Sequence, residues 1–149
     1  MERENPGRRG GAVSTRAQDV RALSAERVAR ALARELVGRA DVHEGEPVQL
    51  EGDGLAHPDV CVLVASSVRL VAEVAVGALE VDHAQKPGLY AKAGIPELWV
   101  IDLGAELVEV HRVPSGDGYE AIEALGRGER VSPLAFPDVL ISVDEILGE

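Results

Sequence analysis

Three residues in the middle of the chain could together support metal-assisted hydrolysis of a phosphodiester. Asp59 opens one apolar, strand-like run, and Glu73 ends a second one. Carboxylates at the ends of two adjacent strands can share one divalent cation such as Mg²⁺. Lys86 follows on a predicted helix, where its ammonium group can hold a phosphate or orient a water molecule.

Short strands are expected to position the two acidic residues. The runs Val60–Val64 and Leu70–Val76 are β-branched and nearly continuous in apolar character, which is typical of strands that are covered on both faces. Only a few residues separate the runs, so the connection is predicted to be a hairpin or another tight link. Glu73 lies in the second run among apolar neighbours, where a charge needs a partner such as a metal ion or Lys86.

A helix is predicted from Glu80 to Ala93. Asp82, Lys86 and Tyr90 recur at every fourth position and therefore share one face of it. Asp82 is either a further acid near the metal or a surface partner of Lys86, with the surface role slightly favoured. Tyr90 either packs the helix on the sheet or touches the substrate. Pro87 predicts a late start or a kink.

The remaining elements complete one mixed sheet flanked by helices, an α/β (α+β) fold. A first helix is expected to begin after Ser24 as its N-cap and to end by Gly38. The other predicted elements are strands at 47–50, 98–102, 107–113 and 119–125 and a short terminal helix at 143–147. Trp99 is expected to pack in the core and Asp102 to form a turn.

Charge is distributed very unevenly along the chain. The net charge of the 149 residues is −11. Residues 1–39 hold nine arginines and five acids (+4), whereas residues 40–149 hold six basic and 21 acidic residues (−15). An acidic body disfavours strong non-specific binding of DNA, although a bound cation changes the local field. Residues 1–22 are predicted to be a flexible basic segment, more often solvated than bound to phosphate, and residues 23–149 to be the folded domain.

Several other classes of site lack support in the sequence. The four histidines lack zinc-site spacing, and no nucleophile elbow, P-loop or dinucleotide fingerprint is present. Cys61 has no partner for an internal disulfide and is expected to be a buried, inert thiol. No apolar run is long enough to cross a membrane, and the first residues do not resemble a secretory signal. These features favour the cytoplasm.

The segment from His57 to Asp102 resembles the Uma-two family of restriction-endonuclease-like proteins, part of the PD-(D/E)XK nuclease superfamily. The motifs that carry the resemblance are Pro58-Asp59, Glu73-Val74, Asp82 with Lys86, and YAKAGIPELWVID from Tyr90 to Asp102. The resemblance extends roughly from Leu23 to Leu147 and implies a restriction-endonuclease-like mixed sheet flanked by helices.

The resemblance also implies roles for individual residues. Asp59, Glu73 and the backbone carbonyl of Val74 match the ligands of Mg²⁺, for which Mn²⁺ could substitute. Ala75 occupies the position where many nucleases of the superfamily carry a lysine, and Lys86 matches the lysine that this family places on the helix. DNA is then the expected substrate, and a homodimer would supply two sites for two strands.

Three functions remain open on the sequence. The first is a Mg²⁺-dependent endonuclease that uses Asp59, Glu73 and Lys86. The second is a catalytically inactive interaction protein on the same scaffold. It is favoured by the missing Y-E-x-x-x-G segment and by VGAL, which stands where the family has a loop close to S-P-S-T. The third is a metal-dependent phosphohydrolase that acts on a small substrate.

Overall fold

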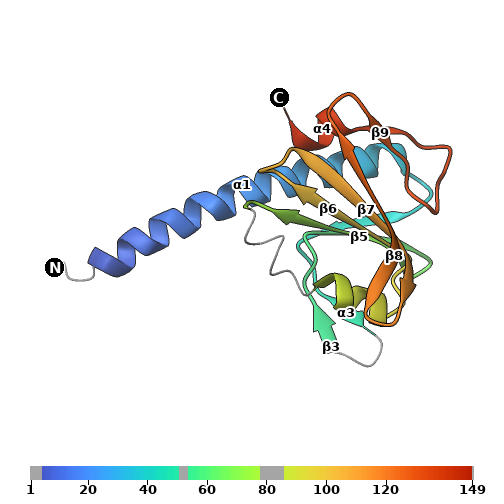
Figure 1. Cartoon of the computed structure of the whole chain (residues 1–149), viewed down its shortest axis with the longest axis horizontal. Helices are drawn as coiled ribbons and strands as arrows, with labels where there is room; N and C mark the ends of the chain where they lie inside the picture. Colours follow the sequence, from blue (N-terminus) through green and yellow to red (C-terminus); the bar gives the residue numbers. More distant parts are fainter. Residues whose placement is uncertain (1–4, 51–53, 78–85, 149) are drawn as a thin grey trace.

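A six-stranded mixed sheet forms the centre of the molecule (Figure 1). The computed structural model describes residues 5–50, 54–77 and 86–148, and for residues 5–15 and 86 it describes the backbone only. In spatial order the strands are β1 (Asp41–Glu44), β4 (Val60–Val64), β5 (Ser67–Ala75), β6 (Glu97–Asp102), β7 (Leu107–Ser115) and β8 (Gly118–Gly126). Neighbouring strands are antiparallel except β5 and β6, which are parallel. The predicted mixed sheet flanked by helices is therefore confirmed.

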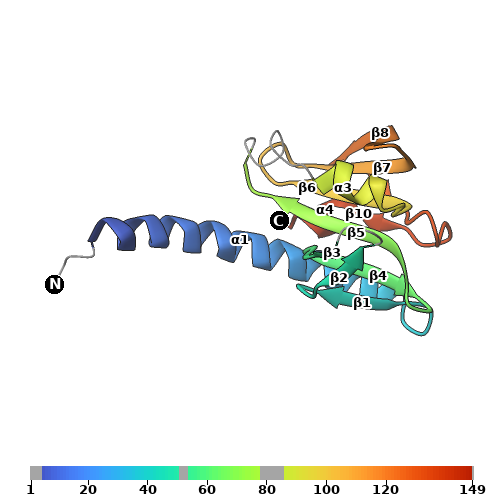
Figure 2. The same cartoon turned by 90° about the horizontal axis from the view of Figure 1, so that it is seen from below.

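Helices cover the two faces of this sheet. The long helix α1 (Asn5–Glu35) and the short α4 (Val143–Leu147) pack together on one face. The helix α3 (Lys86–Lys92) packs on the other face, as the two perpendicular views show (Figures 1 and 2). None of the described helices has the length and apolar character that crossing a membrane requires.

Two small two-stranded sheets accompany the main one. β2 (Val48–Leu50) pairs with β3 (Gly54–Ala56), and β9 (Arg130–Val131) pairs with β10 (Ile141–Ser142). Buried residues of β2 and β3 extend the core on the α3 side.

The side chains of β5 alternate between two cores, as the period of a strand requires. Leu70, Ala72 and Val74 belong to the core under α1, whereas Val71 and Ala75 belong to the core under α3. Glu73 follows the second set, so its side chain lies on the α3 face of the sheet. The prediction of strands covered on both faces is confirmed, and the consequence is that a charged side chain enters an otherwise apolar layer.

Cys61 lies on the same α3 side and is buried. Burial raises the pKa of its thiol to about 11, because the thiolate would be poorly solvated there. The predicted inert thiol agrees with this environment.

A tight hairpin joins β4 to β5 and fixes their relative register. Val64 pairs with Ser67, so only Ala65 and Ser66 form the turn. Both have positive φ angles, 51° and 69°, as the favoured two-residue turn of type I′ requires. The register shifts by one residue between Leu63 and Val62, and beyond this irregularity Val60 pairs with Ala72, which brings Asp59 to the level of Glu73. The predicted tight link is therefore confirmed.

The first helix differs from the prediction. It begins at Asn5 rather than after Ser24, and Ser24 is a buried residue inside it. The periodic apolar face that suggested a start at Ser24 marks only the part of the helix that packs on the sheet. The predicted boundary between residues 22 and 23 thus falls within α1, and the division into a flexible segment and a domain stays a prediction. The helix predicted from Glu80 is described only from Lys86 onward, since residues 78–85 lie outside the described part.

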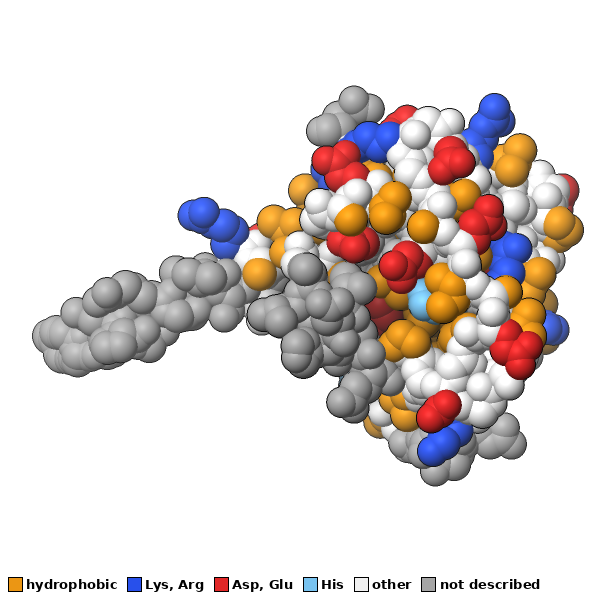
Figure 3. Space-filling view, in the orientation of Figure 1, with side chains coloured by type: hydrophobic (Ala, Val, Ile, Leu, Met, Phe, Trp, Pro, Cys, Tyr) orange, Lys and Arg blue, Asp and Glu red, His pale blue; other side chains and the backbone are white. Residues whose placement is uncertain are grey.

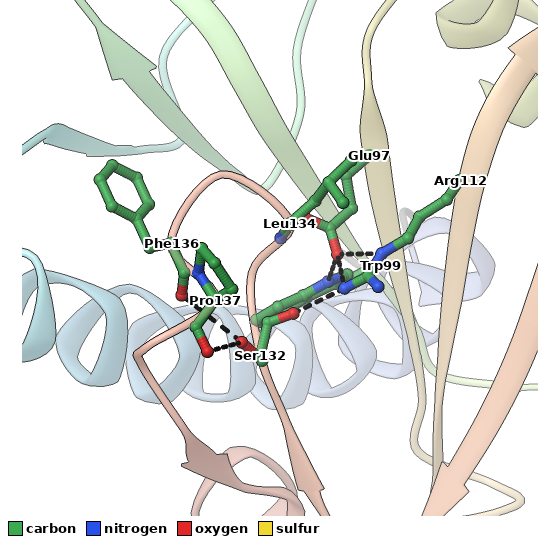
Figure 4. Close-up of polar contacts among 7 residues, drawn as sticks. All are labelled: Glu97, Trp99, Arg112, Ser132, Leu134, Phe136 and Pro137. Atoms are coloured by element: carbon green, nitrogen blue, oxygen red, sulfur yellow. Dashed lines mark hydrogen bonds and ion pairs between the residues drawn. The ribbon is translucent and has the colours of Figure 1, made fainter.

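A buried carboxylate ties the start of β6 to the rest of the structure (Figure 4). Glu97 is fully buried and accepts hydrogen bonds from the indole of Trp99 (2.8 Å) and from the backbone N–H of Leu134 (2.8 Å). Arg112 donates to it from Nε (3.0 Å) and Nη2 (2.8 Å), and Nη2 also donates to the carbonyl of Ser132 (2.6 Å). This network locks β6, β7 and the loop after β9 together, so Glu97 is a structural residue. Trp99 is buried in the core, as predicted.

Candidate functional site

The proposed metal ligands meet around one residue of β5, Val74. Its backbone N–H donates to Oδ2 of Asp59 at 2.8 Å. Its carbonyl oxygen accepts a hydrogen bond from Nη1 of Arg21 on α1 at 2.6 Å. Glu73 directly precedes it in the strand. An acidic side chain and a basic one are therefore held beside the backbone at which the sequence predicts a cation.

Asp59 is fixed at the point where β4 begins. Its carbonyl oxygen accepts from the N–H of Gly45, just beyond β1, at 3.0 Å. Its carboxylate accepts a hydrogen bond from the N–H of Val74. Without this bond, the N–H of Val74 would need another acceptor. The side chain of Asp59 therefore links β4 to β5 just beyond their last backbone pair, and this link holds its carboxylate beside β5.

Glu73 is positioned by a buried tyrosine. The hydroxyl of Tyr90 on α3 donates to Oε2 of Glu73 at 2.5 Å, and Tyr90 is fully buried. Burial, and next the negative charge of Glu73, raise the pKa of this hydroxyl far above its ordinary value. The hydroxyl therefore keeps its proton and acts as a donor. This bond orients the carboxylate of Glu73.

Arg21 brings a positive charge from α1 to the same backbone position. Its contact with Val74 spans 53 residues of sequence. Charged hydrogen bonds of this kind are stronger than neutral ones, so the guanidinium competes for the carbonyl oxygen that a metal ion would use.

The other predicted site residues are placed only in part. Lys86 is the first residue of α3, one helical turn before Tyr90, and its side chain lies outside the described part. Asp82 also falls outside it. Asp102 accepts from the N–H of Ala105 at 3.0 Å, so the predicted turn role is confirmed.

The donor set around Val74 suits a hard divalent cation. Two carboxylates and a backbone carbonyl are oxygen ligands of the type that Mg²⁺ and Mn²⁺ prefer. Within residues 5–50, 54–77 and 86–148, no three acidic, histidine or cysteine side chains converge as a metal cluster. A cation here would rely on Asp59, Glu73 and the Val74 carbonyl, with solvent or substrate oxygens completing its coordination.

The sequence matches the model of a known protein family. The family model of Uma2, described as a putative restriction endonuclease, matches residues 13–144. The chain belongs to the Uma2 family. The match includes Asp59, Glu73, Lys86 and Tyr90, so the whole arrangement around Val74 lies within the Uma2 region, together with Arg21 of α1.

A solved structure shares the Uma2 fold seen here. It is a crystal structure of a putative nuclease belonging to DUF820 from Anabaena variabilis, with a TM-score of 0.67 and 16% sequence identity. The alignment covers 86% of this chain and 80% of that one. No curated protein is similar enough to count as a match. The fold predicted from the resemblance is thereby confirmed, whereas the roles of individual residues are not tested by these comparisons.

Sequence reasoning missed one residue at the site, Arg21, and left the role of another, Tyr90, open. Arg21 gave no signal, because its partner Val74 lies in a distant strand and is apolar. Tyr90 had a signal, its place on one helical face with Lys86, but the sequence left its partner open. The structure gives it one, Glu73.

Proposed function

We propose that the protein is a metal-dependent endonuclease that hydrolyses phosphodiester bonds of DNA. The observation that carries the proposal is the contact between Asp59 and the N–H of Val74, which brings the two acidic residues together in a chain of the Uma2 family. The proposed metal ligands are Asp59, Glu73 and the carbonyl of Val74. A bound Mg²⁺ or Mn²⁺ would supply an activated water and would offset charge on the phosphate.

Residues around the proposed metal site would hold its ligands in place and bind the phosphate. Tyr90 holds the carboxylate of Glu73, and the N–H of Val74 holds that of Asp59, so both acids keep their orientation without the substrate. Lys86 is proposed to orient the attacking water or a phosphate oxygen, since it starts the helix that carries Tyr90. The positive charge of Arg21 lies where a phosphate could approach.

The test is cleavage of supercoiled plasmid DNA by the purified full chain. Nicked or linear products should appear with Mg²⁺ or Mn²⁺ and should not appear with EDTA. Cutting both strands would take two sites, so a homodimer is expected if linear product accumulates before nicked product. Absence of cleavage with either cation, across pH and salt, would contradict the proposal.

A specific observation favours a second candidate, an inactive interaction protein on the same scaffold. The carbonyl of Val74 already accepts a hydrogen bond from Arg21, so the cation would have to share or displace that contact. This candidate predicts no rise in the melting temperature with Mn²⁺, whereas a ligand that binds only the folded state raises it. A melting curve with and without Mn²⁺ therefore separates the two candidates.

Removing the hydroxyl of Tyr90 should weaken metal binding selectively. Tyr90→Phe keeps the ring that packs in the core but loses the hydrogen bond that orients Glu73. Loss of such a supporting contact is expected to weaken Mn²⁺ binding about tenfold. Calorimetric titration with Mn²⁺ measures the effect.

Tyr119→Phe is the matched control for this prediction. Tyr119 is also buried, and its hydroxyl donates to the carbonyl of Ile95 at 2.8 Å. Both variants should lose about 1 kcal/mol of stability. Equal effects of the two variants on Mn²⁺ affinity would show that Tyr90 has no special role at the site.

A further inference from the structure

The first part of α1 extends away from the rest of the molecule (Figures 1 and 2). The helix begins at Asn5, and the first side chain that is even half-buried among those described is Ala17. The segment from residue 5 to residue 16, called the arm here, is about 18 Å long at the helical rise per residue. A helix of this length outside the core can serve as a contact surface for a partner.

The arm and the body carry opposite charges. Residues 5–16 contain three arginines (8, 9 and 16) and no acidic residue. Residues 17–149, called the body here, carry a net charge of −13 from 11 basic and 24 acidic residues. Acidic side chains (red) are spread over the body in the space-filling view (Figure 3). A polyanion would therefore be repelled by the body and attracted by the arm.

Many arginines of the body are occupied by ion pairs. Arg34 pairs with Glu145, Arg39 pairs with Asp138 at 2.8 Å, and the buried Glu97 is paired with Arg112. Arg16 is exposed and forms no ion pair with any residue of the described part. Its charge is thus available to a ligand.

The arm leaves the body beside the candidate site. Arg21, on the next turns of the same helix, donates to the carbonyl of Val74, next to Glu73. A ligand lying along the arm would therefore approach the end of β5 from the α1 side, next to Val74.

We infer that the arm, residues 5–16, binds the phosphate backbone of duplex DNA and holds the duplex near the end of β5 that carries the candidate site. This inference rests on the proposed function, because it takes DNA as the substrate. An arm of about 18 Å spans roughly five base pairs. Contacts of this type are independent of base sequence and involve the release of counterions.

Composition favours DNA over an anionic membrane as the partner of the arm. Helices that lie in a membrane surface present a large apolar face that is rich in Leu, Phe or Trp. The arm contains none of these residues, and Val13 is its largest aliphatic side chain.

The test compares two double variants of the full chain that each remove two positive charges. Arg9→Gln/Arg16→Gln alters the arm. Arg69→Gln/Arg130→Gln is the control, because both of these arginines are exposed on the body and form no ion pair with a described residue. Binding of a fluorescein-labelled DNA duplex is measured by fluorescence polarisation over a range of salt concentrations, with Ca²⁺ as the only divalent cation.

The arm variant should bind at least about tenfold more weakly than wild type at moderate salt. The slope of log K against log salt should fall in magnitude by about 0.9 for each lost phosphate contact. The control variant should keep the wild-type slope. Equal slopes in the two double variants, or no duplex binding by wild type, would overturn the inference. Loss of binding to phosphatidylserine vesicles without loss of DNA binding would also overturn it, in favour of a membrane partner.

The same experiment separates this inference from the proposed function. Duplex binding that depends on the arm, without plasmid cleavage, would refute the nuclease proposal and leave the arm as a DNA contact. Cleavage by wild type, with unchanged duplex binding by the arm variant, would refute the arm and leave the nuclease.

Discussion

Replacing Glu73 with glutamine should abolish metal-dependent cleavage of DNA while the protein stays folded. The amide oxygen of glutamine can still accept the hydrogen bond from Tyr90, so the local packing is kept. The negative charge that would bind the cation is lost. Since removing one preorganised electrostatic contact typically costs a factor of about 10²–10³, loss of a metal ligand should reduce the cleavage rate at least about a thousandfold. Single-turnover cleavage of plasmid DNA measures the change.

Glu123→Gln is the matched control, because this substitution removes the same charge at an exposed position. Glu123 lies on β8, which β6 and β7 separate from β5. Its cleavage rate should stay within about twofold of wild type, because surface charges at a distance are screened by salt. Mg²⁺-dependent cleavage that survives in the Glu73 variant would remove this residue from the site. A thermal melt and a circular dichroism spectrum confirm that both variants are folded.

Glu97→Gln should cause the largest loss of stability of any single change discussed. The carboxylate is fully buried and accepts from three side-chain or backbone donors of different elements, Trp99, Arg112 and Leu134. Glutamine at this position leaves the guanidinium of Arg112 without a negative partner. Its amide NH₂ group also lies next to the N–H donors that the carboxylate oxygens accept from. Breaking one side of a buried ion pair costs about 3–5 kcal/mol of unfolding free energy. Urea denaturation measures this loss.

A second variant separates the ion pair from general packing. In Glu97→Leu/Arg112→Met both charges are removed together, so no uncompensated charge remains, and the loss should be smaller than for Glu97→Gln. Glu120→Gln, on the exposed β8, should change the unfolding free energy by less than about 0.5 kcal/mol. A loss below about 1 kcal/mol for Glu97→Gln would show that the network is not stabilising.

The central elements of the fold could be predicted because their residues obey simple periods. Val60–Val64 and the run that ends near Ala75 are short and β-branched, which limits them to strands. Strand β7 alternates between half-exposed and buried residues from Leu107 to Val110, as its sequence pattern predicts, and the alternation breaks at the buried His111. The resemblance to the Uma2 family added the restriction-endonuclease-like type of sheet, which periodicity alone does not indicate.

The short strand β2 and the helix α4 were predicted, but β1, β9 and β10 could not be, for a physical reason. β1 consists of the mostly polar residues Asp41–Glu44, and its strand conformation comes from pairing with β4 rather than from its own pattern. β9 and β10 are two residues each and exist only as partners of one another. The long α1 was predicted too short because Pro6 and three glycines in its first turns disfavour a helix intrinsically.

At the candidate site, the sequence could predict the contact between neighbouring strands but not the contacts that the helices make with the sheet. The sequence indicated both strands of the hairpin, but the register shift that brings Asp59 opposite Glu73 leaves no mark in the apolar pattern. The hydrogen bond from Arg21 to Val74 depends on how α1 packs across the sheet, and no local pattern encodes that packing. The same holds for the partner of Tyr90, which the packing of α3 on β5 decides.

The most direct test of this account is a crystal structure of the full chain grown with Mn²⁺, with the ion located by its anomalous scattering. We expect one ion bound by Asp59, Glu73 and the carbonyl of Val74, with the guanidinium of Arg21 displaced from that carbonyl. The contradicting result, at saturating Mn²⁺, is a site without anomalous density in which Arg21 still donates to Val74.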